Sequence, residues 1–254
     1  MLKYLLITSV AHKYNGHRPR LRLHGKRSDV PKVDIFVTCC GEPWQVAVDT
    51  IKAACSLDYP SDRYRVFLLD DGNSDILWRK VIDLRKSYHN LRYATRHASI
   101  KTHSKAGNLN FGLEKSASSD PAEFVAVLDV DMIPSPHWLR ALLPHILHNP
   151  DVVLANPPQH FYNVPRDDRL GVNLEWRWVA DVVMPLQEAV DAAWCTGSGF
   201  IAKRSAIEAI GGFPEESLQE DNLTSTLLAA KGWKVAYVNE YVQWGLAADS
   251  LKAM

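Results

Sequence analysis

Residues 124–131 read Phe-Val-Ala-Val-Leu-Asp-Val-Asp, five apolar residues followed by two aspartates with one residue between them. An uninterrupted apolar run of this length is typical of a strand buried on both faces, as in a parallel sheet covered by helices. Predicted strands at 33–38 and 65–69 contain the shorter apolar runs 35–37 and 66–69, and they are followed by Gly41-Glu42 and by Asp70-Asp71-Gly72. Ligands of such sheets bind beyond the carboxyl ends of the strands. The sequence therefore predicts one ligand site lined by these strand exits.

Strands and helices alternate along most of the chain. The apolar pattern predicts strands at 33–38, 65–69, 91–95, 124–128, 152–155, 199–202 and 234–238. It predicts helices at 43–57, 76–88, 105–115, 138–147, 170–193, 204–210 and 221–231. This alternation indicates a single α/β domain with a mixed, mostly parallel sheet and helices on both faces, preceded by a basic tail over residues 1–30.

Composition excludes several classes of protein. The 254 residues carry 29 Lys and Arg against 29 Asp and Glu, so no surplus of positive charge favours nucleic acid as a partner. The four cysteines form no Cys-x-x-Cys pair, which argues against a zinc site and for reduced thiols. No apolar run is long enough to span a bilayer. The basic stretch 17–27 is expected to be a solvated arm, with a contact to anionic lipid as the alternative.

The Asp129-Val-Asp131 pair has two interpretations. Carboxylate oxygens at the end of a buried strand suit Mg²⁺ or Mn²⁺, which bind through one or two carboxylates plus substrate phosphates. An Asp-x-Asp pair is also common by chance, and a loop or cap before Pro134 would explain it equally well. The Asp70-Asp71-Gly72 segment is likewise either a tight turn or a pair of hydrogen-bond acceptors for a ligand.

Two helix starts add further candidates. Lys105 begins a predicted helix, whose free N–H groups could hold a diphosphate. Asp221 precedes another helix and is either its N-cap or a general base at the edge of a cleft. The chain contains neither Gly-x-x-x-x-Gly-Lys-Ser/Thr nor Gly-x-Gly-x-x-Gly, which weakens the case for a hydride-transfer enzyme.

Taken in order, these segments resemble the catalytic domain of the processive family 2 glycosyltransferases, which include cellulose, hyaluronan and chitin synthases. The resemblance runs from Val33 to about Leu251. It is carried by Val33-Asp-Ile-Phe-Val-Thr-Cys-Cys-Gly-Glu-Pro43, Leu57-Asp-Tyr-Pro60, Val66-Phe-Leu-Leu-Asp-Asp-Gly72, His103-Ser-Lys-Ala-Gly-Asn-Leu-Asn110, Phe124-Val-Ala-Val-Leu-Asp-Val-Asp131, Cys195-Thr-Gly-Ser198, Gln219-Glu-Asp221 and the segment 232–248.

The resemblance implies a nucleotide-diphospho-sugar transferase fold of the glycosyltransferase A type. It implies inverting, metal-dependent transfer of a hexose from a UDP-sugar to a hydroxyl acceptor such as a polysaccharide, with Mg²⁺ or Mn²⁺ as cofactor. The implied donor half spans 31–140 and the acceptor half 141–254. The resemblance implies that Glu42 and Asp71 bind the uridine and that Lys105 binds the diphosphate. It implies that Asp129 contacts the nucleotide or diphosphate and the metal, and that Asp131 binds the metal. It also implies an acceptor channel at Thr196, Gly197 and Ser198, with Asp221 as the general base.

The sequence departs from the family pattern in ways that leave alternatives open. Cys40 and Gly41 stand where the family has Tyr and Asn, and Thr196 replaces the Cys of the acceptor segment. The Gln-x-x-Arg-Trp motif and the membrane helices of the synthases are absent. The chain is therefore expected to be either a fragment of a membrane synthase or a soluble offshoot, and a degenerate nucleotide-sugar-binding protein is the rival to an active transferase.

A location at the cytosolic face of a membrane also follows from the resemblance. The predicted helix 170–193 carries aromatic and aliphatic residues among charged neighbours, as an interfacial helix does, although a core helix is the more common case. We therefore expect weak association with a membrane surface or a membrane-spanning partner, or aggregation when the chain is expressed alone.

Overall fold

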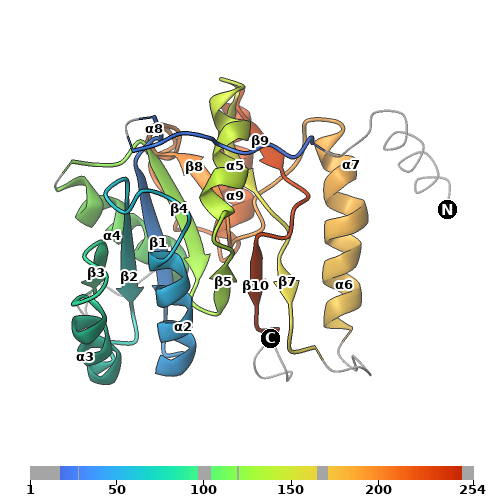
Figure 1. Ribbon diagram of the computed structural model, residues 1–254. Coiled ribbons are helices and arrows are strands. Elements are labelled where there is room, and N and C mark those ends of the chain that lie inside the picture. Colours follow the sequence, from blue (N-terminus) through green and yellow to red (C-terminus); the bar gives the residue numbers. More distant parts are fainter. Residues whose placement is uncertain (1–17, 28, 97–103, 119, 165–170, 248–254) are drawn as a thin grey trace.

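The computed structural model describes residues 18–27, 29–96, 104–118, 120–164 and 171–247. Its main sheet has seven strands in the order β3-β2-β1-β4-β8-β6-β9 (Figure 1). Strand β8 is antiparallel to β4 and β6, and the other pairings of this sheet are parallel. The mixed, mostly parallel sheet predicted from the sequence is confirmed. The strands are β1 (Val33–Cys39), β2 (Tyr64–Asp70), β3 (Leu91–Ala94), β4 (Phe124–Asp129), β6 (Val152–Asn156), β8 (Ile201–Lys203) and β9 (Lys234–Tyr237).

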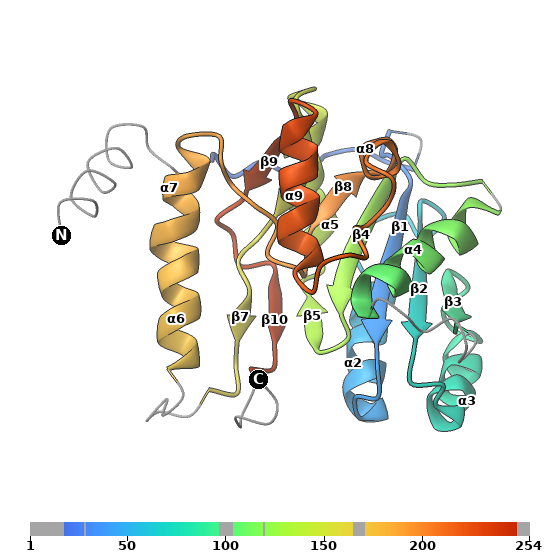
Figure 2. The same cartoon turned by 180° about the vertical axis from the view of Figure 1, so that it is seen from behind.

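Helices cover both faces of this sheet, as Figures 1 and 2 show from opposite sides. One face carries α2 (Trp44–Cys55), α3 (Asp75–Leu84) and α5 (Trp138–Leu147), and the other carries α4 (Ser104–Ala117), α8 (Arg204–Ala209) and α9 (Glu220–Ala230). Strand β1 shows why the centre of its sequence is a continuous apolar run. Ile35 and Val37 pack into the core on the α2 side, while Phe36 between them packs into the core on the α4 side.

A second, three-stranded sheet was not predicted from the sequence. It has the order β5-β10-β7, with β5 (Met132–Pro134), β7 (His160–Phe161) and β10 (Gln243–Gly245). Strand β10 runs antiparallel to β5 and parallel to β7. Strands of two or three residues are too short to produce a recognisable apolar period. Because β5 begins directly after Asp131, this small sheet supports the same loop that carries the paired carboxylates.

The helix predicted over 170–193 is shorter and is interrupted by a π-helical turn. It consists of α6 (Val172–Trp178), the π turn η2 (Val179–Val183) and α7 (Met184–Glu188), and residue 170 lies outside the described part. Trp176 packs against Phe161 with ring centroids 5.7 Å apart, and Met184 is fully buried. The Tyr237 hydroxyl donates a 2.9 Å hydrogen bond to the Ala180 carbonyl within the π turn. This helix therefore covers the edge of the small sheet and β9.

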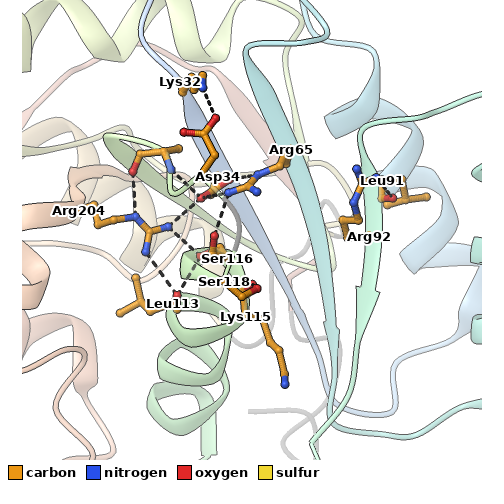
Figure 3. Close-up of polar contacts among 12 residues, drawn as sticks. Lys32, Asp34, Arg65, Leu91, Arg92, Leu113, Lys115, Ser116, Ser118 and Arg204 are labelled. Carbon is orange, nitrogen blue, oxygen red and sulfur yellow. Dashed lines mark hydrogen bonds and ion pairs between the residues drawn. The ribbon is translucent and has the colours of Figure 1, made fainter.

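A buried ion triad fixes the end of α4 that lies away from the strand exits (Figure 3). Asp34 is fully buried and accepts hydrogen bonds from Arg65 at 2.7 and 2.8 Å and from Arg204 at 2.8 Å. The two guanidinium groups also donate to the carbonyl and hydroxyl of Ser116 in the last turns of α4. A buried carboxylate is tolerated when such partners satisfy its oxygens. The triad thus joins β1, β2 and α8 to the helix that carries Lys105.

The described part of the basic segment, residues 18–27, runs along the domain with six of its ten residues exposed, and a few contacts attach it there. Arg18 pairs with Glu188 of α7 at 2.5 Å, and Arg22 donates hydrogen bonds to both carboxylate oxygens of Glu240. Leu23 donates its N–H to the Arg140 carbonyl of α5 at 2.8 Å. The sequence alone does not show that these partner carboxylates lie within reach of Arg18 and Arg22. Within the described residues, no helix is both long and apolar enough to cross a bilayer.

Candidate active site

A pocket of about 320 Å³ lies at the carboxyl ends of β1, β2 and β4, beside the start of α4. Small-molecule sites typically enclose about 300–1,000 Å³, so the pocket is large enough for part of a nucleotide sugar. The strand exits named from the sequence converge here, as the rule for parallel sheets predicts. The lining residues are Thr38, Cys39, Cys40, Glu42, Asp71, Lys105, Asn108, Asp129 and Asp131.

The two carboxylates of the Asp70-Asp71-Gly72 segment have different environments. Asp70 is fully buried and accepts hydrogen bonds from the Gly72 N–H at 2.8 Å, the Ser74 N–H at 3.0 Å and the Tyr93 hydroxyl at 2.7 Å. These contacts make Asp70 the residue that holds the turn. Asp71 lines the pocket instead, so the turn and ligand interpretations of the segment apply to different residues.

Arg96, which follows β3, holds Asp71 in place. Its guanidinium donates to both carboxylate oxygens, at 3.0 and 2.6 Å, and both side chains are almost completely buried. A bidentate pair of this kind fixes the direction of the carboxylate as well as its charge. At the end of the neighbouring strand β1, Glu42 accepts a 2.6 Å hydrogen bond from the Cys40 N–H. This contact holds the loop after β1 beside the pocket.

Lys105 lies between Asp129 at the end of β4 and the 195–198 segment. Its ammonium group is 2.5 Å from Asp129 Oδ1, donates a 2.7 Å hydrogen bond to the Gly197 carbonyl and lies 3.8 Å from Glu220. Burial lowers the pKa of Lys105, but Asp129 and Glu220 together outweigh this effect and the net pKa is raised. Lys105 is therefore a firmly positive group between the strand exits and the 195–198 segment.

Asp129 and Asp131 present a pair of carboxylates to the pocket. Asp129 accepts from the Thr38 hydroxyl at 3.2 Å in addition to Lys105, so one of its oxygens is fixed. Burial, followed by the charges of Asp129 and Glu42, raises the pKa of Asp131 to about 6. The charged form of Asp131 thus lacks full compensation in the protein alone, which is the state expected of a carboxylate that receives a cation.

The donor set fits a divalent cation that is bound together with phosphate. Within the described residues, no group of three or more His, Cys, Asp and Glu side chains is arranged to hold a metal ion. Asp129 and Asp131 supply oxygen ligands at one pocket, and Mg²⁺ is commonly bound by one or two carboxylates completed by water and substrate phosphates. These two residues could therefore hold Mg²⁺ or Mn²⁺ once a diphosphate is present.

The segment Thr196–Ser198 lies behind Lys105 and does not line the pocket itself. The Thr196 N–H and hydroxyl both donate to Asn156 Oδ1, at 3.1 and 2.8 Å. The Ser198 hydroxyl accepts a 3.0 Å hydrogen bond from the Asp129 N–H. Gly197 has a φ of +87°, a conformation that favours glycine, and its carbonyl accepts from Lys105. The segment is thus attached to the strand exits at two points.

Asp221 lies next to Gly197, in the first turn of α9. A Cβ atom placed on Gly197 would lie 3.0 Å from Asp221 Oδ2 and 3.8 Å from Lys105 Nζ. The N-cap of α9 is Gln219, so Asp221 is not the capping residue. Burial raises the pKa of the neighbouring Glu220, against the effect of Lys105. The structure therefore brings Asp221 to the border of the site, outside the residues that line the pocket.

Sequence analysis missed three residues at or behind the site. Arg96 is basic, but its pairing with Asp71 spans 25 positions and has no local signal. Asn108 lines the pocket and donates to the Leu69 carbonyl at 2.9 Å, and its presence within Lys105-Ala-Gly-Asn108 could have indicated it. Gln243, in the unpredicted strand β10, contacts Ser198.

The family described as Glycosyl transferase family 2 matches residues 34–211 of this chain. The chain belongs to this family. The catalytic subunit of cellulose synthase 1 from Komagataeibacter xylinus is 30% identical over 240 residues, covering 92% of the chain and 31% of the relative. A cellulose synthase catalytic subunit from Xanthomonas axonopodis pv. citri is 30% identical over 237 residues, covering 87% of the chain and 30% of the relative. A putative cellulose synthase 2 from Komagataeibacter xylinus is 31% identical over 230 residues, covering 87% of the chain but 14% of the relative.

This family 2 glycosyltransferase thus spans a third or less of the curated relatives it matches. Solved structures agree on the fold. The mannosyltransferase PcManGT from Pyrobaculum calidifontis, in complex with GDP-Man and Mn2+, superposes with a TM-score of 0.71 at 20% identity, covering 97% of this chain and 65% of that one. S. aureus TarS 1-349 in complex with UDP gives 0.58 at 14% identity, covering 85% and 61%. The glycosyltransferase A-type fold and the cellulose synthase-like resemblance are both confirmed.

Proposed function

We propose that this chain transfers a hexose from a UDP-sugar to a hydroxyl acceptor, with inversion at the anomeric carbon and with Mg²⁺ or Mn²⁺ as cofactor. The observation that carries the proposal is the position of Lys105. Its ammonium group contacts Asp129 on the donor side and the Gly197 carbonyl on the side of Asp221. A positively charged ammonium group placed between the pocket and a carboxylate suits a reaction that develops negative charge on a leaving diphosphate.

The donor half, residues 31–140, would hold the nucleotide. Glu42 and Asp71 would accept hydrogen bonds from the uridine, and the Arg96 pair would keep Asp71 pointing in one direction. Lys105 would meet the diphosphate, and Asp129 would contact the nucleotide or diphosphate. Asp131, whose pKa is raised to about 6 mainly by burial, would hold the cation together with Asp129. When bound, the cation would neutralise part of the charge on the leaving UDP.

The acceptor half, residues 141–254, would supply the base. Thr196, Gly197 and Ser198 would line the approach of the acceptor, and Asp221 would take the proton of its hydroxyl group. The acceptor oxygen then bonds to the anomeric carbon as the bond from that carbon to the diphosphate breaks, and the electron pair leaves with UDP. Attack from the side opposite the diphosphate inverts the anomeric configuration. The names of the relatives suggest a polysaccharide as acceptor.

We further propose that the site works at the cytosolic face of a membrane, as part of or beside membrane-spanning segments. Cys39, Cys55 and Cys195 are buried thiols that form no disulfide, which fits a reducing compartment. Flotation with anionic liposomes at low and high salt tests surface association, which a protein that never floats would contradict.

Calorimetry with UDP tests the donor site. We expect UDP to bind only with Mg²⁺ or Mn²⁺ present, and Asp131→Ala to abolish this binding. The matched control is Asp83→Ala, which removes a carboxylate from the exposed end of α3 and should leave binding unchanged. Equal binding of UDP in the presence of a chelator would contradict the metal role.

An assay of UDP release from UDP-sugar donors separates an enzyme from a binding protein. A transferase should turn over, and Asp221→Asn should abolish turnover while metal-dependent UDP binding persists. A chain that binds UDP but releases none from any donor and acceptor mixture would instead be a nucleotide-sugar-binding protein.

A further inference from the structure

We infer that Gln243 is a positioning residue. It would hold Asp129, a proposed metal ligand, and the 195–199 segment in fixed positions relative to each other. The inference rests on the proposed function. Gln243 lies in β10 and is fully buried, although a side-chain amide is costly to bury unless both its oxygen and its nitrogen are satisfied. Its side-chain partners are Ser198 and the carbonyl of Pro158, which both lie outside the three short strands of its own sheet.

The contacts of Gln243 fix the orientation of its amide. Its Oε1 accepts from the Ser198 hydroxyl at 3.3 Å, and its Nε2 donates to the Ser198 carbonyl at 3.0 Å and to the Pro158 carbonyl at 3.4 Å. Two carbonyl groups facing one end of the amide require the nitrogen there. The oxygen at the other end therefore takes the hydroxyl proton of Ser198.

This orientation determines what Ser198 can do for Asp129. Once its proton is committed to Gln243, the Ser198 oxygen has its lone pairs free, and one of them accepts the Asp129 N–H at 3.0 Å. Asp129 begins the Asp-x-Asp pair at the end of β4. A continuous chain of hydrogen bonds thus runs from Gln243 through Ser198 to the backbone of a proposed metal ligand.

The Gln243 side chain also restricts the position of the backbone at Gly199, next to Ser198. Gly199 has a φ of +76°, and a Cβ atom there would overlap the Gln243 carboxamide. From the other direction, the indole N–H of Trp138 donates to the Gly199 carbonyl at 2.8 Å. The backbone is therefore held between two large side chains, two residues after Gly197, whose carbonyl contacts Lys105.

Strand β10 supports the second carboxylate as well. The Leu246 N–H, one residue beyond β10, donates to the Asp131 carbonyl at 3.2 Å. Gly245 pairs with Met132 in the register of β10 and β5, directly after Asp131. Both members of the Asp-x-Asp pair are thus supported from this strand, one through the Gln243 side chain and one through the backbone.

Substituting Gln243→Met tests the inference. Methionine keeps the length and apolar packing of the side chain but removes every hydrogen bond. Residues that support metal ligands from behind typically change metal affinity or activity by about 10- to 100-fold. We expect Mn²⁺-dependent UDP affinity, measured by calorimetry, to fall by about tenfold or more. Ser198→Ala should cause a similar loss, and the double variant should lose little more than either single one, because the two residues act in one chain.

Asn163→Leu is the matched control. Asn163 also makes two side-chain amide hydrogen bonds across the small sheet, to the N–H and carbonyl of Ala247, but it does not touch Ser198. Both variants should lower the melting temperature, and only Gln243→Met should weaken metal-dependent UDP binding.

The outcomes separate the inference from the function beneath it. Equal UDP affinity of Gln243→Met and the unmodified chain, with a lowered melting temperature, would overturn the positioning role and leave the proposed function standing. Additive losses in the double variant would also overturn it. Failure of the unmodified chain to bind UDP with Mn²⁺ would overturn both.

Discussion

Replacing Asp131 by Asn should stabilise the metal-free protein above pH 6, although it removes a proposed metal ligand. Burial, with the charges of Asp129 and Glu42, raises the pKa of Asp131 from 3.8 to about 6. A shift of about two pKa units, at about 1.4 kcal/mol per unit, corresponds to at most about 3 kcal/mol against the folded state. Solvent at the pocket mouth screens part of this, so we expect a gain of about 1–3 kcal/mol.

The pH dependence has a definite sign. The folded pKa of Asp131 lies above the unfolded value, so the folded state binds more protons between about pH 4 and 6 and loses stability as the pH rises through that window. Asparagine does not titrate. The advantage of Asp131→Asn should therefore be small near pH 3.5 and complete by pH 7.5.

Urea unfolding in the presence of a chelator measures this difference. Asp129→Asn is the control of opposite sign, because it removes the charge that pairs with Lys105 at 2.5 Å and should destabilise the protein. Equal stability of Asp131→Asn and the unmodified chain at pH 7.5 would refute the reasoning, as would a gain that does not change with pH.

Three further substitutions test other parts of the structure. Arg96→Met leaves the buried Asp71 without its bidentate partner and should lower the free energy of unfolding, measured with urea, by about 3–5 kcal/mol. A loss below about 1 kcal/mol would show that water replaces the guanidinium. Burial lowers the pKa of His145 from 6.5 to about 4, so the unmodified chain should lose up to about 3 kcal/mol between pH 6.5 and 4, and His145→Gln should remove that slope. Gly199→Ala places a side chain at a φ of +76° against Gln243 and should cost about 2 kcal/mol or more, and an unchanged melting temperature would contradict this.

The sequence predicted the main sheet because its strands are buried on both faces. A strand such as Val33–Cys39 is buried at every position, and its central residues Ile35, Phe36 and Val37 fill two cores, which makes them visible as a continuous apolar run. The helix over 138–147 was predicted with its observed bounds. The strands at 132–134, 160–161 and 243–245 were missed because their pairing is determined by partners far along the chain.

The same distinction applies to the site. The positions of Asp71, Asp129 and Asp131 around one pocket follow from a rule of topology, which the sequence pattern makes available. The buried contacts of Arg96 and Gln243 do not, since they join residues 25 and 45 positions apart. No apolar period or turn motif encodes which distant polar groups will meet, so the roles of residues behind the pocket become visible only in three dimensions.

The π turn at Val179–Val183 changes the phase of the helix that contains it. In a regular α-helix, about 100° per residue would turn Met184 some 80° away from Trp176. The turn takes up one extra residue, so the two side chains come to within about 20° of one face. Trp176 can then pack on Phe161 while Met184 fills the core. The segment behaves as an ordinary helix with one inserted residue. Deleting one residue within 179–183 would therefore leave the side chains of α7 on the same face of the helix. The same deletion within α5 would turn all later side chains of that helix by about 100°.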